Sequence, residues 1–149
     1  MSSATPAELP ESAQRVARLL QQLGHDKPVV VLPQTGKTSA EAAAGLGCEV
    51  AQIAKSIIFR RASDDAPVLV IASGVNRVDE AKVADQVGAL AKADAKFVRE
   101  MTGYAIGGVC PIGHAVKPVM LLDQDLFQYD SLWAAAGHPH AAVSYTHLT

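Results

Sequence analysis

Residues suited to chemistry gather in one glycine-rich stretch of this sequence, at positions 102–114. It reads Thr-Gly-Tyr-Ala-Ile-Gly-Gly-Val-Cys-Pro-Ile-Gly-His and holds four glycines and one proline within eleven residues. Gly107 and Gly108 can leave backbone N–H groups free to face a ligand, because no Cβ blocks the approach. Pro111 fixes its own φ and removes one donor. The stretch predicts a rigid recognition loop, with a tight connection of ordinary turn chemistry as the alternative.

Lys55 is a second residue with a candidate role. It opens an apolar, strand-like segment directly after a helix-like one. A cation in this place could be directed into a cleft at the end of the strand. The alternative is a surface lysine that lays its aliphatic stem along apolar neighbours and keeps its ammonium in water.

Cys110 and His114 lie four residues apart in the glycine-rich stretch. A cysteine acts as a nucleophile where a base or a cation holds it as a thiolate, and His114 could be that base. The alternative is an inert loop thiol. Cys48 is the only other cysteine, and a lone pair in a mid-sized chain indicates reduced thiols of a cytoplasmic protein.

The sequence shows no pattern typical of a metal or cofactor site. His138 and His140 flank Pro139, but they lack the cysteine partners or the helical spacing of zinc ligands. Positions 36–38 (Gly-Lys-Thr) look like the end of a P-loop without its upstream glycine. A nucleophile elbow and a dinucleotide fingerprint are also missing, so neither a metal nor a cofactor is predicted.

The composition fits one globular domain. The chain has 149 residues, of which 49% are apolar and 19% charged. No apolar run is long enough to cross a bilayer, and the first ten residues lack the pattern of a secretory signal, so we expect a cytoplasmic protein without membrane contact. The net charge of −2 argues against a large footprint on nucleic acid, so any such contact must be small and local.

Local patterns predict a mixture of helices and strands, typical of an α+β domain with a mixed sheet. The central feature is a hairpin of two apolar strands joined by the polar connection 60–67. A later apolar run is interrupted by Pro118 and is therefore predicted as an edge strand. The predicted helices are 11–23, the segment from the capping box at 38–41 to Gly47, 79–87, 94–102 and 130–136. The predicted strands are 28–32, 55–59, 68–72 and 116–122. A turn is predicted at 137–140.

These stretches together resemble the YbaK / prolyl-tRNA-synthetase-associated domain family of aminoacyl-tRNA deacylases. The resemblance runs from about Glu11 to His140 and rests on the Lys55 segment combined with the Gly-Gly-x-x-Pro-x-Gly loop. The matching segments are 38–47, 53–59, 73–79, 91–94 and 102–114.

The resemblance implies a single α+β domain with a mixed, partly curled sheet flanked by helices. It also implies hydrolysis of mischarged aminoacyl-tRNA, engaged at its acceptor end, with a synthetase as a further partner. Lys55 lines up with the functional lysine of the family, which is thought to meet the terminal adenosine. The residues of the loop and of one following turn line up with the substrate pocket: Gly107, Gly108, Cys110, Pro111, Gly113, His114 and His138.

An ester of this kind is already activated, so the pocket needs to supply only modest catalysis. Backbone N–H groups of Gly108 and its neighbours could hold the developing oxyanion, and one such donor contributes about 10²- to 10³-fold in rate. Lys55 could pair with the phosphate of the 3′ end or polarise the carbonyl. The nucleophile is left open between water, a ribose hydroxyl and the side chain of the substrate, and so is the amino acid that is removed.

Two other functions stay open at this point. One is a catalytically silent module of the same fold that binds tRNA ends or nucleotides. The other is an unrelated small-molecule hydrolase that uses Cys110 and His114.

The sequence also departs from the family pattern at two places. Position 110 is Cys where relatives often carry Ser, Pro or another small residue. Residues 142–149 match nothing in the family. We therefore divide the chain into a flexible lead-in (1–10), the domain (11–141) and a tail (142–149) that is truncated or not native.

Overall fold

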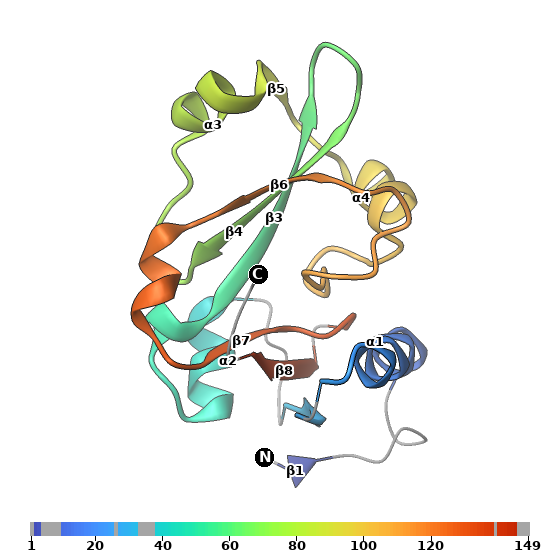
Figure 1. The fold of residues 1–149 in the computed structure, drawn as a ribbon, viewed down its shortest axis with the longest axis vertical. Helices are drawn as coiled ribbons and strands as arrows, with labels where there is room; N and C mark the ends of the chain where they lie inside the picture. The colour runs from blue at the N-terminus through green and yellow to red at the C-terminus, as the bar shows by residue number, and fades with distance from the viewer. Residues whose placement is uncertain (1, 4–9, 26, 33–37, 139, 146–149) are drawn as a thin grey trace.

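The computed structural model describes residues 2–3, 10–25, 27–32, 38–138 and 140–145. Within these ranges four α-helices lie around two four-stranded sheets (Figure 1). The predicted α+β class with a mixed sheet is confirmed, although the strands form two sheets. The helices are α1 (Glu11–Gln22), α2 (Ser39–Leu46), α3 (Glu80–Val87) and α4 (Ala95–Thr102).

A long hairpin forms the centre of the mixed sheet. Its strands are β3 (Ala54–Arg61) and β4 (Pro67–Ser73), which pair antiparallel over seven residue pairs. The short strand β5 (Leu90–Ala91) continues the sheet beyond β3, and β6 (Val119–Leu122) runs parallel to β4 at the other edge. All residues of β4 are buried, as expected for an apolar strand covered on both faces.

The second sheet is antiparallel and contains strands that lie far apart in the sequence. Its order is β1 (Ser2–Ser3), β2 (Val29–Val31), β8 (Ala141–Tyr145) and β7 (Leu132–Ala135). An isolated parallel bridge between Ile53 and Trp133 links this sheet to the start of β3. Two 3₁₀ turns, η2 (Val50–Gln52) and η3 (Gln124–Gln128), lead into β3 and out of β6.

The prediction of a helix at 130–136 is wrong, because this segment contains strand β7. Its three alanines favour a helix in isolation. Pairing with β8 overrides this preference and buries Leu132 and Ala134 on one face, with Trp133 and Ala135 less buried on the other.

The fold also extends beyond the predicted domain boundaries. Residues 142–145, assigned to a tail, belong to β8, and the Val143 side chain is fully buried. Ser2–Ser3, assigned to the lead-in, pair with β2. The other residues of these two segments, 1, 4–9 and 146–149, lie outside the described ranges.

Side chains cap three of the helices at their first residues, including the start predicted at 38–41. The hydroxyl of Thr38 accepts a hydrogen bond from the Glu41 N–H at the start of α2. Asp79 accepts from the N–H groups of Ala81 and Lys82 at α3. Asp94 caps α4 in the same way, by accepting from the N–H of residue 97. These side chains satisfy backbone donors that a helix leaves without partners at its start.

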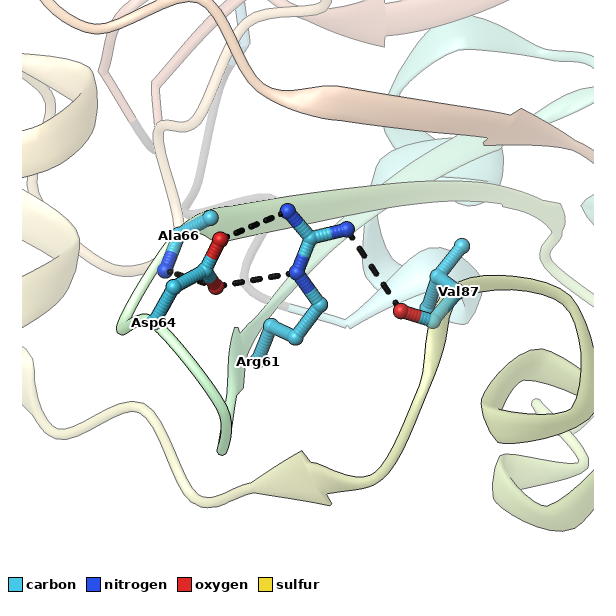
Figure 2. Close-up of polar contacts among 4 residues, drawn as sticks. All are labelled: Arg61, Asp64, Ala66 and Val87. Atoms are coloured by element: carbon cyan, nitrogen blue, oxygen red, sulfur yellow. Dashed lines mark hydrogen bonds and ion pairs between the residues drawn. The ribbon is translucent and has the colours of Figure 1, made fainter.

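Side-chain hydrogen bonds also order the tip of the β3–β4 hairpin (Figure 2). Arg61 donates from Nε and Nη2 to the two carboxylate oxygens of Asp64, at 2.9 and 2.8 Å. Asp64 also accepts from the Ala66 N–H, and Arg61 reaches the Val87 carbonyl at the end of α3. The bond from Arg61 is the main reason why the pKa of Asp64 falls from 3.8 to about 2.

Replacing Arg61 with alanine should therefore return the pKa of Asp64 towards 3.8. The folded-state pKa lies below the unfolded one, so the contribution of this carboxylate to stability is present above about pH 4 and is lost as the pH falls to about 2. Carbon-detected NMR of the carboxyl groups during an acid titration measures the shift. The control is Arg60→Ala, which removes the partner of Asp65 and should leave Asp64 unchanged. An Asp64 that titrates alike in all three proteins would contradict the assignment.

Candidate active site

A cavity of about 740 Å3 lies where the start of β3 meets α2, β7 and the glycine-rich stretch. Its volume falls within the range of roughly 300–1,000 Å3 that is common for small-molecule sites. Most of its lining is aliphatic, with a few polar side chains. The first half of the chain contributes Leu32, Thr38–Ala40, Ala42, Leu46, Val50, Ile53–Ile58 and Gly74 to this lining. The second half contributes Ala93, Val98, Ile106, Gly107, Val109, Trp133–Ala135 and Ala141–Ala142.

Lys55 and Gly107 line this same cavity, so the fold brings together one residue from each stretch that the sequence singled out. Lys55 is half-buried, and its Nζ donates a hydrogen bond to the Asn76 carbonyl at 2.8 Å. Its acceptor is a neutral carbonyl, so the positive charge is not neutralised by this bond. The ammonium retains two further N–H groups, each of which could donate a hydrogen bond to a ligand oxygen.

Much of the cavity lining is apolar. Leu46, Ile53 and Leu32 belong to one buried cluster against which Trp133 packs, and all four side chains line the cavity. Such a surface suits a small apolar side chain better than a charged one, because a buried charge without a partner is costly. The cavity therefore combines the cationic side chain of Lys55 with a largely apolar lining.

The glycine-rich stretch needs a glycine at position 108 for close packing. A Cβ there would lie 2.8 Å from the backbone N and Cα of His138, and 2.9 Å from the Gly137 carbonyl carbon. The Gly108 N–H donates to the Ala105 carbonyl at 3.0 Å. Gly108 is therefore occupied as a donor, and the sequence-based expectation that its N–H faces an oxyanion is not met.

Gly107 is better placed than Gly108 to offer a backbone donor. It lines the cavity, and within the described part of the chain its N–H makes no hydrogen bond. Val109 also lines the cavity, and its N–H likewise makes no hydrogen bond within the described part of the chain. The residues on either side of Gly108 thus keep the donors that the recognition loop was expected to supply.

Cys110 and His114 are not arranged as a nucleophile and its base. The Cys110 side chain is fully buried, and burial raises the pKa of its thiol. His114 Nε2 lies 2.6 Å from the backbone carbonyl of Cys110 and must carry the hydrogen, since a carbonyl only accepts. Burial also lowers the pKa of His114. Neither residue is among those that line the cavity, whereas the sequence predicted both at the substrate pocket.

The remaining predicted pocket residues support the loop from behind. Pro111 is buried and does not line the cavity. Gly113 faces α1, where its carbonyl accepts from Arg15 Nη2 at 3.0 Å. His138 packs its backbone on Gly108, and its ring Nδ1 accepts from the His140 N–H. Burial, followed by the charge of His140, lowers the pKa of His138.

The cavity-lining positions that the sequence did not single out include Ser39, Ser56 and Trp133. Ser39 lies in the capping box at 38–41, which predicts where a helix begins but not which part of the fold that helix end contacts. Trp133 was assigned to a helix that turned out to be a strand. Ser56 follows Lys55 directly, and its Oγ is buried without a hydrogen-bond partner among the residues that the structure describes.

The ranges that the structure describes hold neither a metal-binding cluster nor a membrane-spanning helix. Within them no three or more His, Cys, Asp or Glu side chains come close enough to hold a metal ion. In those same ranges no helix is both long and apolar enough to cross a membrane.

Known proteins resemble this chain in sequence and in fold. The sequence model of a family described as an aminoacyl-tRNA editing domain matches residues 33–148. The uncharacterized protein YwhH of Bacillus subtilis (strain 168) is 32% identical over 126 residues, which cover 84% of this chain and 80% of YwhH.

Two solved structures superpose closely on this chain. One is a protein proposed to be a trans-editing enzyme for prolyl tRNA synthetase, with a TM-score of 0.86 and 42% identity over 93% of this chain and 88% of that one. The other comes from work on grafting epitope backbones onto scaffold proteins, with a TM-score of 0.85 and 40% identity over the same shares. The comparisons agree with the family resemblance and with the α+β fold predicted from the sequence.

Replacing Gly108 with alanine should destabilise the protein by about 1–3 kcal/mol, because the new methyl group overpacks the backbone of residues 137 and 138. Urea denaturation measures the change. The control is Gly47→Ala, whose Cβ would meet nothing within 4 Å but whose φ of 69° is unfavourable for alanine. That backbone effect alone should cost roughly 1–2 kcal/mol. If Gly108→Ala were as stable as the wild type, the backbone at 137–138 would have to move aside at no cost in free energy, which would contradict the close packing.

Proposed function

The chain belongs to the family of aminoacyl-tRNA editing domains, and on that premise we propose that it hydrolyses mischarged aminoacyl-tRNA in trans. The observation that carries this proposal is the shared cavity of Lys55 and Gly107. A cation and an unengaged backbone donor at one cavity are groups that could position an aminoacyl ester and stabilise its oxyanion. We place the reaction in the cytoplasm.

The net reaction consumes one water molecule. Its oxygen forms a bond to the carbonyl carbon of the aminoacyl ester, and negative charge develops on the carbonyl oxygen. The bond from that carbon to the ribose oxygen then breaks, and the ribose oxygen takes up a proton. The free amino acid and an uncharged tRNA leave. We assign the backbone N–H groups of Gly107 and Val109 to the developing oxyanion.

We assign Lys55 to the 3′ end of the tRNA. Its ammonium donates one hydrogen bond to the Asn76 carbonyl and has two further N–H groups for an oxygen of the substrate. Placing the ester within reach of the loop donors is worth a large part of the rate, because the reacting groups no longer need to find each other.

We assign the amino acid side chain to the apolar part of the cavity, around Ile53 and Trp133. A synthetase pocket separates side chains that differ by one methylene by only about 1–3 kcal/mol, so errors with small apolar amino acids need a second hydrolytic site. The solved relative proposed to act for prolyl tRNA synthetase supports a synthetase as partner. With a net charge of −2, contact at the acceptor end alone is consistent with a modest electrostatic contribution.

Replacing Lys55 with alanine should lower the deacylation rate on the order of 100-fold, because the 3′ end loses its fixed position. Single-turnover assays with alanyl-, cysteinyl- and seryl-tRNA carrying non-cognate anticodons measure the rate. The matched control is Lys82→Ala, which removes an exposed lysine from α3. Circular dichroism verifies that both variants fold.

An unaltered rate in Lys55→Ala would refute the assignment of Lys55. Binding of the charged tRNAs by the wild-type protein without turnover across the whole panel would instead favour a silent binding module.

Replacing Cys110 with alanine should leave deacylation close to the wild-type rate, because the thiol is buried away from the cavity. The variant should lose only about 1 kcal/mol of stability for a deletion this small. The same tRNA panel and a thermal melt give the two values. Loss of activity in a variant that melts normally would support thiol chemistry with His114 instead.

A further inference from the structure

The carbonyl that holds Lys55 belongs to a turn that is fastened from both sides. The turn begins at Ser73, the last residue of β4, and Asn76 supplies the carbonyl oxygen that accepts from Lys55 Nζ at 2.8 Å. The side-chain Nδ2 of the same Asn76 donates to Asp123 and to Asp125, both at 2.8 Å. An amide nitrogen has two hydrogens, so each carboxylate takes one. The orientation of Asn76 is thereby fixed.

Asp123 is the centre of this arrangement. One of its carboxylate oxygens accepts from Asn76 and also from the Ser73 N–H at 3.0 Å. The other accepts from the Asp125 N–H at 2.9 Å, at the start of η3. The Asp123 N–H in turn donates to the Ile71 carbonyl of β4 at 2.8 Å. One partly buried carboxylate therefore ties η3, the end of β4 and the turn together.

The ionised form of Asp123 suits this position. Burial by itself would raise the pKa of its carboxyl group, but the hydrogen bonds from Asn76, Asp125 and Ser73 and the charge of Lys55 together hold the pKa below its usual value. The carboxylate is thus ionised at neutral pH and accepts from all its donors at once.

The other side of the turn is held by the segment that leads into β3. The Ser73 hydroxyl donates to the Ala51 carbonyl at 2.8 Å, and the Gly74 N–H donates to the Ile53 carbonyl at 2.8 Å. A side chain at Gly74 would collide with the Val50 carbonyl. The turn consequently has little freedom to move, and neither has the carbonyl that receives Lys55.

We propose that Asp123 is a positioning residue of the active site, which acts through Asn76 to hold the ammonium of Lys55 at the cavity. A lysine side chain has four rotatable carbon bonds, so a fixed acceptor is needed to keep its charge in one place. A direct ion pair with Asp123 would hold the ammonium too, but it would also neutralise the charge that the substrate needs. Because Asp123 acts through the Asn76 carbonyl, the ammonium is held in place without a direct ion pair to the carboxylate. The catalytic consequence rests on the deacylase function proposed above, whereas the positioning does not.

The first experiment measures the accessibility of Lys55 and needs no substrate. Reductive methylation of the folded protein, followed by mass spectrometry, gives the modification rate of each lysine. Asp123→Asn places an amide NH2 against at least one backbone donor, because both carboxylate oxygens accept. We expect Lys55 to react several-fold faster in this variant, while Lys82 and Lys96 react as in the wild type.

The matched control is Asp64→Asn. Asp64 also accepts from an N–H and from a side chain, but it lies at the hairpin tip, at the opposite end of β4. This variant should leave the reactivity of Lys55 unchanged. Asp125→Ala, at a more exposed position, removes one of the two acceptors of Asn76 and serves if Asp123→Asn does not fold. Unchanged reactivity of Lys55 in the folded variants at 123 and 125 would overturn the proposal.

The second experiment is a double-mutant cycle on deacylation. Asp123→Asn alone should lower kcat/KM by on the order of 10- to 100-fold, because the ammonium loses its place. In the Lys55→Ala background the same change should have no further effect, since a positioning residue has nothing left to position. Equal losses in both backgrounds would overturn the proposal, because a general structural role would act on either protein. If the wild type hydrolyses no charged tRNA, the deacylase function fails and the methylation rates still decide the role of Asp123.

Discussion

The antiparallel pairing of β3 with β4 is the constraint on which the site depends. Its register sets Lys55 opposite Ala72, one residue before the end of β4. The turn that follows β4 then lies within reach of the Lys55 ammonium, and Asn76 can accept from it. A shift of one residue would move Lys55 to the other face of the sheet, because side chains alternate along a strand. The full burial of β4 makes such a shift costly, so the core protects the position of the charge.

The facing wall of the cavity depends on close backbone packing. Gly108 lies against the turn of residues 137 and 138, which connects β7 to β8. The Tyr104 hydroxyl donates to the Ile112 carbonyl at 2.8 Å and closes the loop on itself. Arg15 of α1 lies over the Tyr104 ring and binds the loop at Gly113. The loop therefore has a rigid inner side, and Gly107 is left on the side that faces the cavity.

Most loop residues pack against the protein and only a few face the cavity, so under the proposed function few of them need to touch a substrate. The buried thiol of Cys110 contributes packing volume, and the half-buried imidazole of His114 contributes a hydrogen bond to the chain. Preorganised donors and one charge are sufficient for an activated ester, since their value comes from being fixed before the substrate arrives. The same logic extends behind Lys55, where the carboxylate of Asp123 fixes a carbonyl and not the cation itself.

The sequence by itself determined the elements whose cause is local. Helix caps such as Thr38 and the hairpin around 60–67 depend on neighbours a few residues away, so their patterns could be interpreted without a fold. The family resemblance likewise pointed to Lys55 and Gly107. Tertiary structure alone decided that 130–136 is a strand, because its partner β8 supplies the burial that alanine propensity cannot predict. It also decided the contact of Asp123 with Asn76, which lies 47 residues away and meets it only when β6 pairs with β4.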